Sequence, residues 1–386
     1  MKVQDSKKIL LIQLGDIGDV VWTTPTLWAV KGFFPRAKIA MLVREGVGPL
    51  LEGDPSLEKV FEVKHYQGNF LRKGMEEARF LISLRREHFD LVFDLRAGDR
   101  GAILAYLTGA PNRVSLLYRK GVPFWRNRLF THLIDPPPTT EKPRGAAEQS
   151  LRIVRGLGIA AHDTTPRLWV SEKIRNHTRD LLRNEKIVDQ PRWITVNPFS
   201  RWAYKEWGYE KWVEVLDWLW GAYQIAAVLV GSASERGKAE GIAGKCKGAV
   251  FNLAGRTSLD GLLGLLSMSS LHIGVDSGAP HIAAAAGTPT ITIYGPTDWY
   301  DWAPPGERHW VVAPELECVP CFQKGCNGKE WSRCLEELKA EKVKRVITEA
   351  LDRMSILPQN IGPHLDDPKS SLGILEGEFT SRTPSK

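Results

Sequence analysis

Short apolar runs of strand composition alternate with helical patterns along this chain, and the whole alternation occurs twice. The strand-like runs are 8–14, 38–43, 59–63, 91–94 and 113–115 in the first half, and 193–196, 225–230, 250–253, 271–273 and 290–293 in the second. Such alternation is typical of a parallel sheet with helices on both faces. We therefore predict an α/β protein of two doubly wound, Rossmann-like domains that face each other across a cleft.

Breaks in the pattern suggest where these domains end. Prolines and glycines become frequent from residue 134 to 143, and the stretch 158–170 reads as an interdomain connection. The expected divisions are a first domain over 1–157, a linker over 158–170, a second domain over 171–354 and a flexible tail over 355–386. The tail is rich in Pro, Gly, Ser and charge, with little periodicity.

Charge and composition narrow the classes of partner. The formal net charge is +7, so the surface favours anionic partners such as phosphorylated substrates or an acidic membrane face. Basic residues are interspersed with acidic ones, and the sequence contains no zinc-finger spacing, RNA-recognition signature or basic helix, so we expect no nucleic acid partner. The 14 Trp and the aromatic, basic segment 122–128 would suit contact with lipid headgroups.

The amino-terminal residues lack the form of a signal peptide, because the apolar run 9–12 is short and soon meets Gln13 and Asp16. No segment is long and apolar enough to span a bilayer. We therefore expect a cytoplasmic protein.

The segment 269–281 contains a short apolar strand, a polar turn with glycine and then a helix of small residues. In open α/β sheets ligands bind outside the carboxyl ends of strands, where helix amino termini attract anions. The amides of Ser277 and Gly278 are therefore candidate phosphate ligands. Asp276 would instead accept hydrogen bonds from sugar hydroxyls or from the amides, although Asp and Ser here also suit a helix cap.

The first strand leads into two Gly-Asp pairs, Gly15-Asp16 and Gly18-Asp19. This turn lacks the third glycine of a dinucleotide-binding loop, and its acidic side chains would repel a pyrophosphate. A carboxylate at a strand end is well placed to take a proton from a hydroxyl. Helix capping is the competing interpretation, more so for Asp16 than for Asp19.

Two further loops follow strands in the second half. Arg201 and Lys205 lie in the loop 197–207, and either cation suits a phosphate oxygen, although plain surface exposure explains them as well. Glu235 follows the glycine turn at 231, where it would cap a helix or bind a ribose hydroxyl.

Together these elements resemble the ADP-heptose lipopolysaccharide heptosyltransferases of glycosyltransferase family 9, over about residues 7 to 350. The motifs that carry the resemblance are GDIGDV followed by TTP, NPFSRWAYKEW, LVGSASE, GVDSGAPHIAAAAGTP and ITIYGPTDW. The family implies a GT-B fold, with a nucleotide sugar held mainly by the second domain and an inverting reaction without a catalytic metal or other cofactor. It also implies a lipopolysaccharide inner-core acceptor and peripheral contact with the cytoplasmic face of the inner membrane.

The resemblance also implies roles for individual residues. Asp19 matches the proposed catalytic base of the family. The expected donor-binding positions are Lys205 at the phosphates, Ser200 near the same group, Glu235 at the nucleoside, and Asp276, Ser277, Gly278 and His281 in the donor-binding turn. The loop around Ser200 departs from the Thr-rich form of several relatives.

Four of the five cysteines cluster near the end of the second domain, at Cys318, Cys321, Cys326 and Cys334. Thiolates at this spacing suit a zinc ion, but cytosolic cysteines are often buried and unligated. The pattern resembles a subgroup labelled the third heptosyltransferase. We expect structural, unligated thiols and no metal.

Three other functions remain open at this stage. A transferase of the same architecture would use another nucleotide sugar, and a nucleotide-sugar-binding module would bind donor without turnover. A dinucleotide-dependent oxidoreductase is disfavoured because neither opening strand leads into G-x-G-x-x-G.

Overall fold

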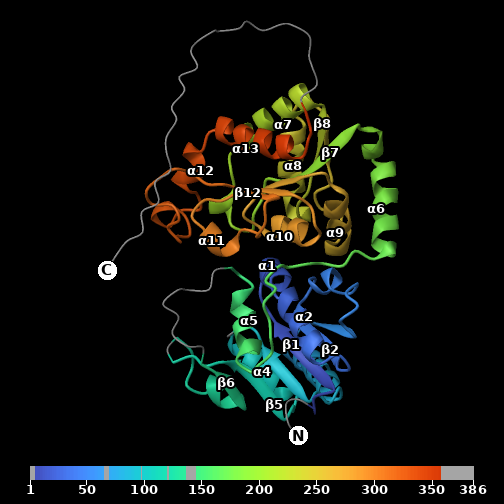
Figure 1. Cartoon of the computed structure of the whole chain (residues 1–386), viewed down its shortest axis with the longest axis vertical. Coiled ribbons are helices and arrows are strands. Elements are labelled where there is room, and N and C mark those ends of the chain that lie inside the picture. Colours follow the sequence, from blue (N-terminus) through green and yellow to red (C-terminus); the bar gives the residue numbers. More distant parts are fainter. Residues whose placement is uncertain (1–4, 65–68, 97, 120, 136–144, 358–386) are drawn as a thin grey trace, which may run out of the picture.

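The computed structural model describes residues 5–64, 69–96, 98–119, 121–135 and 145–357. It contains two six-stranded sheets, of order β3-β2-β1-β4-β5-β6 and β12-β11-β10-β7-β8-β9, and every strand pair is parallel. Figure 1 shows one sheet with its helices below the other. This confirms the predicted α/β class with two doubly wound units.

The first unit contains β1 (Lys8–Gln13), α1 (Ile17–Val21), α2 (Thr24–Phe33), β2 (Lys38–Arg44), β3 (Lys59–Val63), α3 (Phe70–Arg85), β4 (Leu91–Asp94), α4 (Asp99–Leu107), β5 (Asn112–Leu116), β6 (His132–Ile134) and α5 (Glu148–Arg155). Short 3-10 helices lie at η2 (Gly48–Leu50) and η3 (Arg126–Leu129). The TTP segment starts a new helix, α2, because Pro25 at its first turn suits a helix start and not a helix interior.

The second unit contains α6 (Glu172–Asn184), β7 (Arg192–Asn197), α7 (Tyr209–Tyr223), β8 (Ile225–Leu229), α8 (Arg236–Ala243), β9 (Val250–Asn252), α9 (Leu259–Met268), β10 (His272–Val275), α10 (Gly278–Ala285), β11 (Thr290–Ile293), α11 (Trp299–Trp302), β12 (His309–Val312), α12 (Arg333–Glu337) and α13 (Ala340–Arg353). Its 3-10 helices are η4 (Ile187–Asp189), η5 (Ala203–Lys205), η6 (Ala233–Glu235) and η7 (Cys326–Gly328). In the described part of the chain, no helix has the length and apolar character needed to cross a membrane.

All ten predicted strands are present within two residues of their expected ends, but two strands were missed. These are β6 and β12, each at the edge of its sheet. Both are only three or four residues long, and no residue of β6 is fully buried. Short edge strands carry little of the hydrophobic pattern from which strands are predicted. The predicted tail lies outside the described residues from 358 onward.

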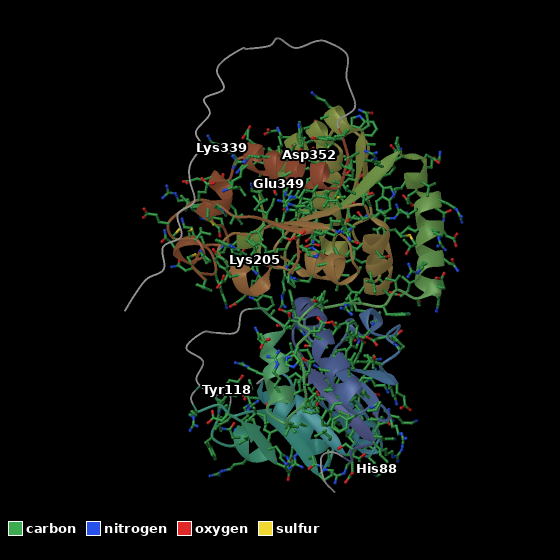
Figure 2. The ribbon with its side chains drawn as sticks, in the orientation of Figure 1. His88, Tyr118, Lys205, Lys339, Glu349 and Asp352 are labelled. Atoms are coloured by element: carbon green, nitrogen blue, oxygen red, sulfur yellow. The ribbon has the colours of Figure 1, made fainter. Side chains whose placement is uncertain are left out.

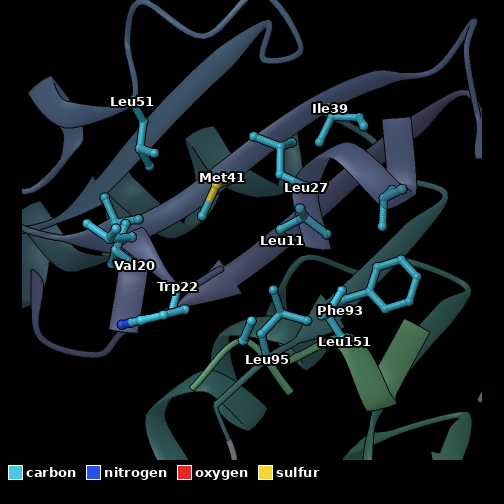
Figure 3. Close-up of a cluster of buried hydrophobic side chains, with 14 of the residues drawn as sticks. Leu11, Val20, Trp22, Leu27, Ile39, Met41, Leu51, Phe93, Leu95 and Leu151 are labelled. Carbon is cyan, nitrogen blue, oxygen red and sulfur yellow. The ribbon is translucent and has the colours of Figure 1, made fainter. Parts of the chain in front are cut away.

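The central strand β1 shows how the sheet buries both faces. Ile9, Leu10, Leu11 and Ile12 are all fully buried. Leu11 belongs to a cluster that includes residues of α1, α2 and α5, whereas Leu10 and Ile12 belong to a cluster on the α3 and α4 side. Figure 3 shows Leu11 in the first of these clusters. Burial on both faces explains why this strand reads as a continuous apolar run.

The two units are joined through a continuous apolar interface. Helix α1 packs on α10, and one buried cluster includes Val20 and Val21 of α1 together with Ile282 and Ala283 of α10. Figure 1 places α1 at the junction with the second unit. The segment between α5 and α6 follows the same interface, since the Leu168 amide donates to the carbonyl of Ala285 at 2.8 Å.

Glycines at this interface permit the close approach of α1 and α10. A Cβ at Gly278 would lie 3.1 Å from Cγ2 of Ile17, and one at Gly18 would lie 2.9 Å from Cδ2 of His281. Since ordinary carbon contacts lie near 3.5–4.0 Å, a larger residue at either place would force the helices apart.

A buried ion pair stabilises the carboxyl end of β4. Arg126 Nη2 donates to Asp94 Oδ2 at 3.0 Å and to Ser115 Oγ at 2.9 Å, and both charged side chains are excluded from solvent. Burial raises the pKa of Asp94 to about 6, although Arg126 acts in the opposite direction. The guanidinium also stacks near the rings of Tyr118 and Phe130.

Replacing Arg126 by Met should therefore destabilise the protein by about 3–5 kcal/mol, because it leaves the Asp94 carboxylate buried without its partner. Urea denaturation measures the change. Arg119→Met is the matched control, because Arg119 pairs with Asp135 at the surface and such pairs contribute about 0–1 kcal/mol. The double variant Asp94→Asn/Arg126→Met should recover much of the loss. Equal stabilities of the Arg126 and Arg119 variants would contradict the assignment.

Candidate active site

A cleft of about 540 Å³ opens between the two units, at the carboxyl ends of β1, β4, β7 and β10. Its lining comes from both sides and includes Gly15, Asp16, Ile17, Gly18, Asp19, Arg44, Arg96, Ser200, Arg201, Trp202, Lys205, Asp276, Ser277, Gly278, His281, Thr297 and Trp302. Strand ends of open α/β sheets are the usual ligand sites of such folds.

On the first unit, Asp19 lies in the first turn of α1. Its Oδ2 accepts a hydrogen bond from the Asp16 amide at 2.8 Å and also binds Nη1 of Arg96. The side chain of Asp19 is only 16% exposed, whereas that of Arg96 is 48% exposed. Asp19 thus caps the start of α1 and presents a paired carboxylate to the cleft.

Gly15 makes room for this pair. A Cβ at residue 15 would lie within about 2.5 Å of Arg96 Nη1 and of the Asp19 side chain. A side chain at this position would therefore displace Arg96 or Asp19. The glycine is explained by this close approach of charged side chains to the backbone.

Asp16 connects the two units. Its Oδ1 binds Nη1 of Arg44 from β2 at 2.5 Å and Nη1 of Arg201 from the second unit at 3.0 Å. All three side chains are substantially exposed, so these pairs contribute little to stability. Arg201, expected at the donor phosphates, thus lies at the cleft but pairs with Asp16 in this structure.

On the second unit, Lys205 and Asp276 form the most sheltered charged pair of the cleft. Lys205 Nζ lies 2.6 Å from Asp276 Oδ2, and the two side chains are 19% and 7% exposed. Ser200 Oγ donates to the carbonyl of Asp276 at 3.4 Å. Figure 2 shows Lys205 on the side of the second unit that faces the first.

The amino terminus of α10 opens into the same cleft. Ser277 is its N-cap residue and Gly278 its first helical residue, and both line the cleft. Ser277 Oγ accepts a hydrogen bond from Asn197 Nδ2 at 3.0 Å, which orients the start of the helix. Free amides and the helix dipole favour an anion at this end.

His281 lies one turn into α10 and is 5% exposed. Burial is the main cause that lowers its pKa to about 4; Lys205 also lowers it, whereas Asp276 acts in the opposite direction. The ring is therefore neutral near pH 7. Its Nδ1 accepts from Trp22 Nε1 of the first unit at 3.3 Å, so His281 connects the cleft to the domain interface.

Eight of the nine predicted site residues line this cleft, and Glu235 does not. Its carboxylate instead accepts from the amide of Ser232 at 2.6 Å and from the Ser232 hydroxyl at 2.8 Å, in a capping box at η6. Glu235 was expected either to cap a helix or to bind a ribose hydroxyl, and in this structure it caps a helix. Its contact with a nucleoside stays a prediction.

Two of the three arginines that line the cleft, Arg44 and Arg96, were not predicted from the sequence. Arg96 lies two residues after β4 and Arg44 is the last residue of β2, so both stand at the strand-end edge where ligands bind. The same rule that identified Asp19 would have identified them. Trp302, also missed, has its ring 6.1 Å from that of His281 and carries no strand-end signal.

The four clustered cysteines lie around a separate cavity of about 350 Å³ next to α12. Burial raises the pKa of Cys334 to about 11, and the three neighbouring cysteines add to this rise. The Arg333 amide donates to Cys326 Sγ at 3.3 Å. Among the described residues, no group of three or more His, Cys or carboxylate side chains is arranged to hold a metal ion. The prediction of unligated thiols stands as a prediction.

Comparison with known proteins identifies relatives of this chain. Residues 78–332 match glycosyltransferase family 9 (heptosyltransferase). The chain is 29% identical over 292 residues to lipopolysaccharide heptosyltransferase 3 of Escherichia coli K12, covering 74% of this chain and 82% of that protein. It is 24% identical over 372 residues to lipopolysaccharide heptosyltransferase 1 of Pseudomonas aeruginosa, covering 92% and 99%.

Solved structures have the same fold. ADP-heptose lipopolysaccharide heptosyltransferase II of E. coli matches with a TM-score of 0.72 at 20% identity, over 90% of this chain and 99% of the other. A family 9 glycosyltransferase from Veillonella parvula matches with a TM-score of 0.74 at 19% identity, over 90% and 97%. These likenesses support the GT-B arrangement, and the family match covers well over half of the sequence. The chain therefore belongs to glycosyltransferase family 9, the heptosyltransferases, and is a glycosyltransferase.

Proposed function

We propose that this protein transfers a heptose from ADP-heptose to the inner core of lipopolysaccharide, with inversion at the anomeric carbon. The family and the relatives named above support heptose transfer in lipopolysaccharide core synthesis. The observation that carries the mechanism is that one cleft holds a sheltered carboxylate on one side and a lysine with a helix amino terminus on the other.

The second unit suits the donor. Lys205 and the free amides at Ser277 and Gly278 offer positive charge to the two phosphates of ADP. Asp276 holds Lys205 Nζ at 2.6 Å and so restricts the position of the ammonium group. His281 is neutral, so it adds no charge to this side, and its buried ring supports the start of α10.

The first unit suits the acceptor. Arg96 and Arg44 both present guanidinium groups to the cleft, and guanidinium matches the carboxylates and phosphates of an inner-core acceptor. Arg96 also contacts the Asp19 oxygen that would receive a proton. Binding of an acceptor anion by Arg96 would draw it away from Asp19 and leave that oxygen to the acceptor hydroxyl.

The proposed reaction is a single displacement. The acceptor hydroxyl gives its proton to Asp19 while its oxygen forms a bond to the anomeric carbon. The bond from that carbon to the β-phosphate oxygen breaks, and the electron pair leaves with ADP. Lys205 and the start of α10 stabilise the charge that develops on the departing phosphate. Attack opposite the leaving group inverts the configuration.

Incubation of the protein with heptose-deficient lipopolysaccharide and a panel of nucleotide sugars tests the proposal. Mass spectrometry should show one added heptose with ADP-heptose only. Transfer of a different sugar would assign another donor, and donor binding without any product would assign a binding module.

Asp19→Asn should lower turnover by about 100-fold to 10,000-fold, the usual contribution of a positioned general base. Asn keeps an oxygen for the Asp16 amide, so folding and ADP binding should survive. Steady-state kinetics measures the change.

Asp16→Asn is the matched control on the same turn. Asp16 pairs with two exposed arginines and takes part in the capping box at the start of α1, so its loss should affect turnover far less. A larger loss for Asp16 than for Asp19 would show that the wrong aspartate was chosen, and normal turnover in both would remove the base from this loop.

Lys205→Ala should weaken ADP binding by about 10-fold to 100-fold and lower turnover as well, because a charge-assisted contact with phosphate is lost. Asp276→Ala should also reduce donor affinity. Lys238→Ala is the control, since Lys238 pairs with Glu206 and is not part of the cleft lining. Wild-type affinity of both cleft variants in titration calorimetry would refute the donor site.

The cysteine cluster is expected to stabilise the segment between β12 and α13 without a metal. Elemental analysis of protein purified without chelator should find less than stoichiometric zinc or iron. A stoichiometric metal that is lost on replacing Cys318 and Cys321 by Ser would overturn this expectation.

A further inference from the structure

Helix α3 carries two apolar faces, although only one of them packs on the protein. Phe80, Leu81 and Leu84 pack in the cluster on that side of the first sheet. A surface helix normally has a single apolar stripe, directed to the core. The second stripe of α3 therefore requires an explanation of its own.

The outer face of α3 consists of Leu71, Met75, Ala78 and Ile82. Their spacing of four, three and four residues places them on one side of an α-helix. Leu71 is 75% exposed, Met75 is 55% exposed and Ile82 is 51% exposed, and Ala78 is exposed as well. Phe70, at the start of the helix, is 88% exposed.

Cations border this outer face. Arg72 and Arg79 each follow one of its members by one residue, so they share one border, and Arg85 lies at the other border. Both acidic residues of α3, Glu76 and Glu77, are placed by the helical repeat away from the stripe, and Glu76 pairs with Arg79 at 3.0 Å at an exposed position, where such pairs are weak.

Elements near α3 in the first unit also expose apolar and aromatic side chains next to arginines. Helix α4 contacts α3 and exposes Ile103 and Tyr106, of which the latter lies under the guanidinium of Arg113 at 5.5 Å. Phe124, just before η3, is 79% exposed and lies under Arg128 at 5.6 Å. Exposed aromatic and apolar side chains bordered by arginines are typical of helices that lie in a membrane interface.

We propose that the outer face of α3 docks the first unit on a lipid bilayer with anionic headgroups. The apolar stripe would enter the headgroup boundary while the bordering arginines meet the phosphates. The net charge of +7 favours the same surface. This inference rests on the proposed function, because an acceptor anchored in a membrane has to be reached from that membrane.

The position of α3 suits this role. The carboxyl end of β3 lies at the cleft edge of the sheet, and α3 runs back toward the start of β4, so Phe70 and Leu71 lie at the end of the helix near the cleft. Figure 2 shows His88, just beyond the other end of α3, at the far end of the first unit from the second. A bilayer against α3 would thus lie beside the first unit, the one assigned to the acceptor.

Flotation of the full chain with vesicles tests the docking. Wild-type protein should bind vesicles of phosphatidylcholine mixed with phosphatidylglycerol more strongly than vesicles of phosphatidylcholine alone. The variant Leu71→Gln/Met75→Gln/Ile82→Gln should lose at least about tenfold in binding to the mixed vesicles. Arg72→Gln/Arg79→Gln should lose the preference for the anionic lipid.

Arg179→Gln/Arg183→Gln on α6 is the matched control, because it removes two exposed cations from a helix of the second unit. It should bind the mixed vesicles like wild type. Circular dichroism checks the fold of each variant, and Met75→Gln alone replaces the triple variant if that one does not fold.

Unchanged vesicle binding by the α3 variants would overturn the proposal. A dimer of the wild-type protein in light scattering that the apolar variant abolishes would also overturn it, since the face would then bind a second copy.

Transfer to a lipid-free core oligosaccharide separates the docking proposal from the proposed function. The apolar variant should retain that activity, whereas absence of transfer by wild-type protein that still binds vesicles would refute only the proposed function.

Discussion

The site depends on the contact of α1 with α10. Each helix follows a central strand of its own sheet, and their amino-terminal ends meet at the cleft, where Ile17 packs on Gly278 and Gly18 packs on His281. The apolar cluster that crosses this contact sets the distance between the carboxylate of Asp19 and the start of α10. Since interiors are packed as densely as organic crystals, a small change in side-chain volume here would be transmitted to the cleft.

Each main charge named in the cleft has an opposite partner inside it. Asp19 is paired with Arg96, Asp16 with two arginines, and Lys205 with Asp276. A charged side chain that binds a substrate anion would therefore exchange its present partner for that anion. Exchange of this kind avoids the cost of leaving a buried ion without a partner.

The buried pair of Asp94 and Arg126 connects the core to the same cleft. The Arg96 amide donates to Asp94 Oδ1 at 3.4 Å, and Arg96 in turn contacts Asp19. Burying an ion pair in a core costs desolvation free energy. Here the pair lies directly behind the strand end that carries Arg96. The arrangement supports the first unit's side of the cleft from within, just as Asn197 supports the second unit's side through Ser277.

The local sequence determined the strands, the strand-end turns and the chemical types that follow them, because periodicity and glycine placement are properties of neighbouring residues. The site positions Asp19, Lys205 and the turn at Asp276 were predicted in this way. The rule that ligands bind at strand ends also applies to Arg96. Tertiary structure alone decided which charges meet. Asp16 and Arg201 are 185 residues apart, and Trp22 and His281 are 259 apart, so no local pattern relates them. It also turned Glu235 into a cap, buried Arg126 and left a second apolar face of α3 in solvent, because burial depends on what packs against a residue and not on the residue itself.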